Sequence, residues 1–320
     1  MRRTMARLLA MRLVGAAVTL FVTSFVVYGA LFLAPGSPIN FLVGPQSATP
    51  AMIRRLRAEY HLNEPFLQQW LHWLGGVLHG NLGYSIVEHS SVLGLIGPRL
   101  GTTLLLIAYA GILTIGFGVL VGTVGGLRPG KVDAALTTFT SVGLGVPQYI
   151  AGVVLITFFG VAWGLFPTYG SGSGFGDDLY HLTLPAIALA ISGAAYVSRL
   201  TRAAVREEKA KEHVITARAR GIAPRSILRR HVLRNAAIPV ITVSGLTVAG
   251  LIAGTVVVET AFGINGVGAL LVQSVQESDF PTVQAITLLM VAGFVLVNTA
   301  VDVAYLALDP RIRARQGAGR

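Results

Sequence analysis

Residues 102–127 read TTLLLIAYAGILTIGFGVLVGTVGGL and contain no charged side chain. A helix needs about 20 apolar residues to cross the hydrocarbon core of a bilayer, so this stretch is long enough to span a membrane. The rest of the chain has the same character, because 53% of its 320 residues are hydrophobic and only 12% are charged. This composition is unlike that of a soluble domain and predicts an all-α membrane protein.

Further apolar segments lie on both sides of this stretch and predict six transmembrane helices in total. The fourth apolar run, 184–197, is short and spans only if its helix continues through Arg199 and Arg202, whose long side chains reach the aqueous boundary. We divide the chain into a tail with the first span (1–36), an outer segment (37–99), a core (100–308) with spans at 102–127, 134–166, 184–203, 238–258 and 283–308 and a loop at 204–236, and a second tail (309–320).

The amino terminus has two interpretations. Arg2, Arg3 and Arg7 precede an apolar run, as in a secretory signal peptide. The apolar region of a signal peptide is usually ~7–15 residues long, whereas the run at 13–33 is long enough to cross the membrane. We therefore favour a first span.

The formal net charge of +11 is distributed unevenly over the predicted loops. If both termini are cytoplasmic, the outer side carries only Arg54, Arg55, Arg57 and Arg99 among the basic residues, and all other Arg and Lys residues lie inside. This distribution follows the positive-inside rule. The positive charge is thus explained by topology, and we expect no nucleic-acid partner.

The outer segment has helical signals of its own. One amphipathic helix is predicted to begin at Thr49 and Pro50, and a second after Asn63, with Gly80 ending it. The second helix carries aromatic residues that suit a membrane surface. Two roles stay open for this segment: a lid packed on the helices, or a docking platform for a partner. His72 and His79 within it are two turns apart and lack a carboxylate pair, which argues against a metal site.

Glycine and proline mark particular positions within the spans. Gly118, Gly122 and Gly126 form consecutive GxxxG steps, which permit close helix packing; similar pairs are Gly160 with Gly164 and Gly250 with Gly254. Pro147 should kink or unwind the third span. That break either lines a substrate pathway or only shapes the packing.

No catalytic motif is present. Residues 125–131 match GxxxxGK, but Val132 follows in place of the hydroxyl residue that binds magnesium, and the motif follows a membrane helix instead of a strand. The chain has no cysteine. We expect a chain that is not an enzyme, with no cofactor and no metal of its own.

The loop between the fourth and fifth spans includes the sequence REEKAKEHVITARARGIAP at 206–224. Gly221 and Pro224 predict the end of a short helix, and a second helix carries Arg225, Arg229, Arg230 and Arg234. On charge alone, this loop is either a helical hairpin on lipid headgroups or a docking element for another protein.

The residues of this loop, together with several other segments, resemble the permeases of bacterial dipeptide, oligopeptide and nickel ABC importers. The similarity covers nearly the whole chain, in order. The similar segments are Asn81–Ser85, His181–Pro185, Thr216–Gly221, Arg230–Thr242, Val258–Gly263, Gly266–Gly268, Asp279–Pro281, Asn298 with Asp302 and Tyr305, and Asp309–Arg313.

The resemblance implies the type I importer permease fold (MetI-like), with a coupling helix at 212–224 that inserts into a groove of a cytoplasmic ATPase. Bulk or charge at Ala217 or Gly221 should then uncouple ATP hydrolysis from uptake. The implied coupling residues are Glu212, Thr216, Ala217, Arg218, Arg220, Gly221 and Pro224; those of the loop motif are His231, Arg234, Asn235 and Pro239; those of a pathway or gate are Pro147, Glu259, Asn298 and Asp302.

The resemblance also implies partners and a location. The partners are a second homologous permease, one or two ATPase subunits that bind ATP and magnesium, and an extracytoplasmic substrate-binding lipoprotein, all at the bacterial inner membrane. Residues 215–217 stand where the general importer motif has Glu-Ala-Ala, and Arg234 replaces its later proline; both departures are usual in the peptide branch. Asn265 replaces a proline of the peptide pattern.

Di- or oligopeptides are therefore the expected substrate, with nickel, glutathione and haem as alternatives within the family. A different class, the stand-alone secondary transporter, needs an ionisable group inside the membrane for ion coupling. Asp302, beside Asn298, is the residue that would have to serve. A membrane scaffold or assembly factor is the third interpretation.

Overall fold

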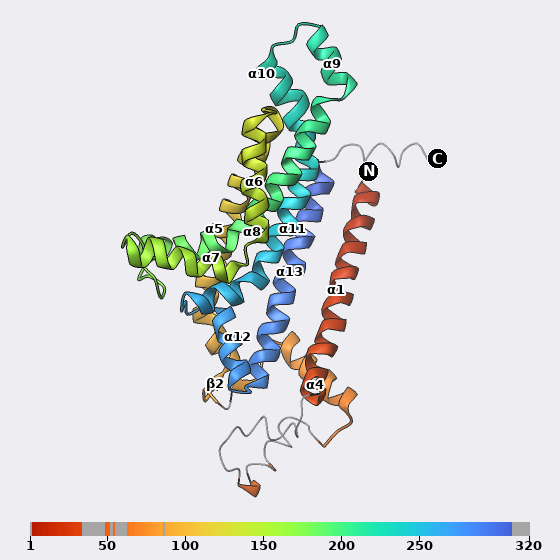
Figure 1. The fold of residues 1–320 in the computed structure, drawn as a ribbon. Coiled ribbons are helices and arrows are strands. Elements are labelled where there is room, and N and C mark those ends of the chain that lie inside the picture. Colours follow the sequence, from red (N-terminus) through yellow and green to blue (C-terminus); the bar gives the residue numbers. More distant parts are fainter. Residues whose placement is uncertain (1, 34–48, 52–53, 55–62, 86, 309–320) are drawn as a thin grey trace.

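The computed structural model describes residues 2–33, 49–51, 54, 63–85 and 87–308 (Figure 1). Five of its helices are long and apolar enough to cross a membrane. They are α1 (Arg2–Leu33), α5 (Val92–Leu127), α8 (Phe175–Lys209), α11 (Arg234–Ala261) and α13 (Phe280–Leu308). The predicted all-α membrane fold is confirmed, and α8 does continue through Arg199 and Arg202 as the short fourth span required.

The third of the six predicted spans is broken. It consists of α6 (Lys131–Gly145), α7 (Gln148–Leu155) and the π-helix η1 (Ile156–Ala162), and its two halves meet at 105°. Pro147 lies at the break, as expected, and Val146 before it is extended, with φ −83° and ψ 116°. A residue before proline avoids the helical region, so α6 ends there. Counting this pair as one span gives the predicted six.

Close packing of α5 on α8 forms the centre of the bundle. Gly118, Gly122 and Gly126 face α8: a Cβ atom at Gly118 would lie 2.7 Å from Val197, and one at Gly126 would lie 2.8 Å from Val205. Only glycine permits this approach, so these three positions pack helices together, as predicted.

The other two GxxxG pairs do not form a continuous packing face: the prediction is wrong for Gly160 with Gly164, and in the pair Gly250 with Gly254 it holds only for Gly254. Gly164 follows the end of η1 with φ +61°, outside any helix. A Cβ at Gly250 would meet nothing within 4 Å, although one at Gly254 would lie 2.6 Å from Leu189. Spacing alone therefore does not identify a packing face.

One end of the bundle carries short elements. A two-residue antiparallel pair, β1 (Tyr84–Ser85) and β2 (Ser90–Ser91), precedes α5, whose N-terminus is capped by Ser91. The helix α12 (Val267–Gln276) lies between α11 and α13 and was not predicted. Of the two predicted outer helices, the one at Thr49 lies mostly outside the described residues.

The second outer helix is present as α4 (Phe66–Leu78). Its N-cap is Pro65 and not Asn63; Pro65 has φ −59° and ψ 145°, and no side chain caps the helix. The indole N–H of Trp70 donates to the hydroxyl of Ser24 at 3.3 Å, and the ring of Phe66 lies 5.4 Å from that of Phe25. One face of α4 thus packs on α1, as a lid would.

At the opposite end, α8 is followed by α9 (Glu212–Ala219), α10 (Pro224–Ile227) and the π-helix η2 (Leu228–Leu233), which continues into α11. Figure 1 shows α9 and α10 beyond the ends of the long helices, at the top of the view. The short helix that Gly221 and Pro224 predicted is therefore present.

Candidate functional site

The ends of α9 are fixed by its own sequence. Gly221 follows the last turn with φ +73°, a conformation that favours glycine. The N–H of Ile222 donates to the carbonyl of Ala217 at 3.2 Å, and the N–H of Gly221 donates to that of Arg218 at 3.0 Å. These two bonds form a Schellman motif, which ends the helix sharply. Pro224 then begins α10.

One face of α9 is buried against the bundle. Val214 and Ala217 pack in an apolar cluster with Val205 of α8, Val232 of η2 and Ala236 of α11. The cluster joins α9 to both long helices that flank the loop. Ala217 therefore faces the bundle.

The opposite face of α9 is exposed. Ile215 is 55% exposed although it is strongly apolar. The predicted coupling residues that share this exposure are Glu212, Thr216, Arg218, Arg220, Gly221 and Pro224. The site is thus a short helix with one face tied to the bundle and one face presented outward.

An acidic residue that sequence reasoning missed holds α9 in place. The carboxylate of Glu208, at the end of α8, is buried and lies 2.6 Å from the Lys211 ammonium and 3.2 Å from Nε2 of His213. The hydrogen bond to Glu208 raises the pKa of Lys211 above its usual value. The available signal was a Glu–Lys pair three residues apart, which on a helix lies on one side.

The second half of the loop motif lies beside this carboxylate. The side-chain amide of Asn235 donates to the carbonyl of His231 at 2.8 Å and lies 3.5 Å from Nε2 of His213. Pro239 and Asn235 line a cavity of about 200 Å³ together with Glu208 and Lys211. Arg234 is exposed at the start of α11.

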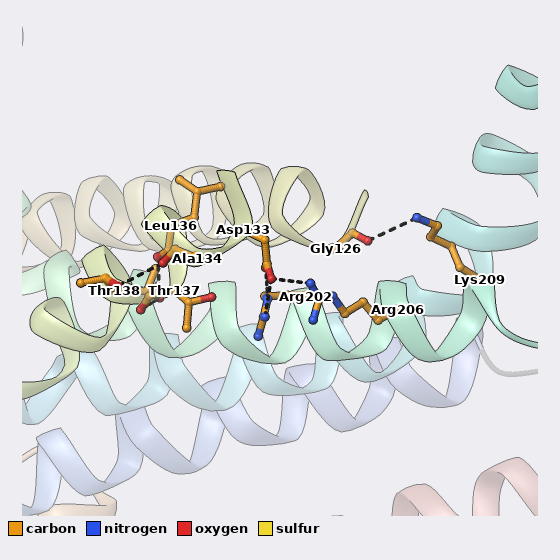
Figure 2. Close-up of polar contacts among 10 residues, drawn as sticks. Gly126, Asp133, Ala134, Leu136, Thr137, Thr138, Arg202, Arg206 and Lys209 are labelled. Carbon is orange, nitrogen blue, oxygen red and sulfur yellow. Dashed lines mark hydrogen bonds and ion pairs between the residues drawn. The ribbon is translucent and has the colours of Figure 1, made fainter. Parts of the chain in front are cut away.

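A second ionic cluster ties the broken span to α8 (Figure 2). Asp133 of α6 accepts hydrogen bonds from Arg202 and Arg206; the distance from Nη2 of Arg202 to Oδ2 is 2.8 Å. Lys209 reaches the carbonyl of Leu127 at 3.3 Å. Arg202 therefore pairs with a carboxylate instead of extending to water, and the ends of α5, α6 and α8 that lie next to the loop are held together.

No hydrogen bond or ion pair links any two of the four predicted pathway residues, all of which the structure describes. Pro147 lies at the break between α6 and α7. Glu259 is fully buried, with its carboxylate accepting from the hydroxyl of Thr103 at 2.6 Å and from the N–H of Ala269 at 3.0 Å. These bonds anchor the N-terminus of α12 to α11 and α5, so Glu259 has a structural role in this geometry.

Asn298 and Asp302 both lie on α13, four residues apart. Asp302 forms an ion pair of 2.7 Å with Arg12 of α1. This ion pair joins α13 to α1.

Comparison with known proteins decides the family. The model described as binding-protein-dependent transport system inner membrane component matches residues 114–314, and its N-terminal companion matches residues 5–107. The chain belongs to this family. It is accordingly a multi-pass membrane permease component of an ABC importer, a non-catalytic subunit, as the sequence resemblance indicated.

Individual relatives agree with this assignment. A probable peptide ABC transporter permease, y4tP of Sinorhizobium fredii, is 36% identical over 94% of this chain and 97% of its own length. The glutathione transport system permease GsiC of Escherichia coli K12 is 34% identical over the same shares, 94% and 97%.

Solved structures show the same fold. The chain resembles the MetNI methionine ABC transporter in an inward-facing conformation, with a TM-score of 0.55 and 21% identity, over 68% of this chain and 97% of that chain. An amino acid ABC transporter solved with histidines gives a TM-score of 0.54 at 17% identity; the match covers 67% of this chain and 94% of that chain. At such identities the similarity concerns the fold alone.

Proposed function

We propose that this chain translocates di- or oligopeptides across the bacterial inner membrane by alternating access, driven through α9 by cytoplasmic ATPase subunits. The observation that carries the proposal is the placement of α9, with Val214 and Ala217 buried on the bundle and Ile215 exposed on the other side. A helix that connects two spans and has one exposed face can contact another protein and be displaced when that protein moves.

Movement of α9 is transmitted through two kinds of contact. The apolar cluster connects it to α8 and α11, and the Glu208 carboxylate bridges it to the end of α8. Because packed interiors deform little, a displacement of α9 moves the ends of both helices together. The Asp133 cluster then extends this rigid unit to α6.

The partners follow from this role. One or two ATPase subunits bind ATP and magnesium and contact α9, and both termini lie on that cytoplasmic side. A second, homologous permease completes the bundle, and a substrate-binding lipoprotein docks on the outer end. The relatives named for peptide transport support the substrate class.

Gly221→Asp tests the coupling. The substitution places a side chain at φ +73° in otherwise open space, which costs about 1–2 kcal/mol of backbone strain and adds a charge beside the exposed face. We expect normal membrane insertion, loss of uptake and ATP hydrolysis that no longer depends on substrate. The measurement is uptake and ATPase rate in proteoliposomes containing the full importer.

Two further variants make the result specific. Ile215→Asp should uncouple in the same way, because it alters the exposed face without strain. Val257→Ser, at an exposed position on α11, is the matched control and should leave uptake unchanged. Full uptake by Gly221→Asp and Ile215→Asp would refute the proposed coupling.

Glutathione is a second candidate substrate, because the GsiC relative is nearly as similar as the peptide permease. Competition distinguishes the two: excess dipeptide should suppress uptake of a labelled tripeptide, whereas suppression by glutathione alone would assign the importer to glutathione.

A further inference from the structure

A recess of about 440 Å³ lies between α1, α4 and α13. Its lining residues, all of which the structure describes, are apolar except for Ser24 of α1. The recess follows both long helices for seven positions, from Ala17 to Ser24 and from Ala285 to Ala292. At 1.5 Å per residue this is about 10 Å along each helix. The recess therefore extends lengthwise between two of the apolar spans.

The walls of the recess are fixed by specific contacts. The indole N–H of Trp70 on α4 donates to the hydroxyl of Ser24, and the Trp70 ring lies 4.9 Å from the ring of Phe21 on α1. Farther along α1, Arg12 forms the ion pair with Asp302 that joins this helix to α13. The recess is thus a part of the fold between two fixed attachments of α1.

The lining offers nothing to a polar ligand. The hydroxyl of Ser24 donates to the carbonyl of Phe21 at 2.7 Å and accepts from Trp70, so the one polar side chain of the lining already has its partners. Apolar cavities stay free of water. Protein interiors also contain few voids larger than a water molecule. A recess of this size and chemistry therefore requires an apolar occupant.

The position of the recess in the spans indicates which occupant that is. Its lining residues on α1 and α13 lie within 10–30 and 280–303, the parts of these helices that are apolar enough to cross a membrane. The surroundings of such spans are lipid hydrocarbon. A helix of another protein needs about 8–10 Å between its axis and that of each neighbour, whereas Cα atoms of α1 and α13 come within 8 Å of each other. A linear hydrocarbon chain is narrower and needs no hydrogen bond.

We propose that the recess binds one acyl chain of a membrane phospholipid, held between α1, α4 and α13. The chain fills the space that the small side chains of Ala17, Ala285 and Ala292 leave open. It completes the packing of α1 on α13 between the Trp70 and Arg12 contacts. The site is separate from α9 and does not depend on the proposed function.

Photolabelling tests the site in the complete importer. The importer is reconstituted into vesicles of phosphatidylethanolamine and phosphatidylglycerol that contain an increasing fraction of a phospholipid with a diazirine in its acyl chain. After irradiation, tandem mass spectrometry locates the adducts on Leu74 and Leu288 of the lining and on Val14 and Val18, which are 62% and 55% exposed on another side of α1. A binding site saturates, so labelling of Leu74 and Leu288 should level off while labelling of the two valines rises in proportion to the probe.

Variants that fill the recess make the test specific. Ala292→Leu adds volume to the lining and should abolish the saturable labelling of Leu74 without changing that of Val14. Ala17→Leu fills the recess from the opposite wall and makes the same test if Ala292→Leu does not insert. Ala300→Leu is the matched control, because it makes the same change at an exposed position of α13 outside the lining.

Two results would overturn the proposal. One is labelling of Leu74 and Leu288 that rises in proportion to the probe, as it does for lipid that only surrounds the protein. The other is saturable labelling that persists in both Ala292→Leu and Ala17→Leu, because the chain would then lie elsewhere.

Discussion

Two buried glutamates hold short helices at opposite ends of the bundle, and they do so by different chemistry. Glu208 is 5% exposed and pairs with the Lys211 ammonium and the His213 ring, both of which reach solvent. Glu259 is 0% exposed and accepts from neutral donors, the Thr103 hydroxyl and the N–H of Ala269. The first carboxylate braces α9, and the second anchors α12.

The difference indicates how each end behaves. The Lys211 ammonium and the His213 ring reach solvent, so water can replace the Glu208 carboxylate as their partner when α9 is displaced. The donors around Glu259 have no such alternative, because a buried donor left without an acceptor costs about 1–3 kcal/mol. We therefore call the α9 end of the bundle the movable end, because water can replace its contacts. We call the α12 end the fixed end, because its buried donors have no other partner.

The largest effect is expected at the fixed end, for Glu259→Ala. The change leaves the Thr103 hydroxyl and the Ala269 N–H unpaired and opens a cavity, which together should lower stability by about 3–5 kcal/mol. The measurement is thermal unfolding of the purified complex, with hydrogen exchange of the peptide 264–279. Glu259→Gln keeps the shape of the side chain and one acceptor oxygen, so its stability should fall much less than that of Glu259→Ala. Equal losses for Gln and Ala would show that the negative charge, and not the hydrogen bonding, anchors α12.

The second effect concerns the movable end, where Glu208→Gln removes the charge that attracts Lys211. We expect the free energy of unfolding to fall by about 1.5–3 kcal/mol, the usual contribution of a hydrogen bond to a charged group. Hydrogen exchange should accelerate in the peptide 206–224 and remain unchanged in 264–279. Acceleration in both peptides would contradict the independence of the two ends.

The parts of this architecture that local sequence determines were predicted. Residues 102–127 and their counterparts are long apolar runs, which require spanning helices. Gly221 and Pro224 indicated the end of α9, because the turn there needs a positive φ and a new helix start. Pro147 located the break in the third span for a similarly local reason.

The remaining features depend on contacts between distant residues. Pro147 gives the place of the break, but the 105° angle is fixed by the bond from Ser192 and the packing of Phe262. Glu259 has its acceptor role only because the fold brings Thr103 to it, from 156 positions earlier in the chain. The pairing of Asp133 with Arg202 likewise joins two helices, and no spacing within either one indicates it.

The smallest effect is expected for Lys211→Met, which removes one cation from the movable end. The Lys211 side chain is 44% exposed, and an ion pair at such a position contributes about 0–1 kcal/mol. Because hydrogen bonding to Glu208 raises the pKa of Lys211 above 10.5, the contribution is present throughout the neutral range and is lost as the pH rises past that value.

The measurement is hydrogen exchange of the peptide 206–224 at low and high salt. Added salt should reproduce part of the Lys211→Met effect in the unchanged protein, since it screens exposed charges. It should have no effect on 264–279, where the donors to Glu259 are neutral and buried. If salt accelerates exchange at the α12 end as much as at the α9 end, the two glutamates do not differ in the way that their surroundings imply.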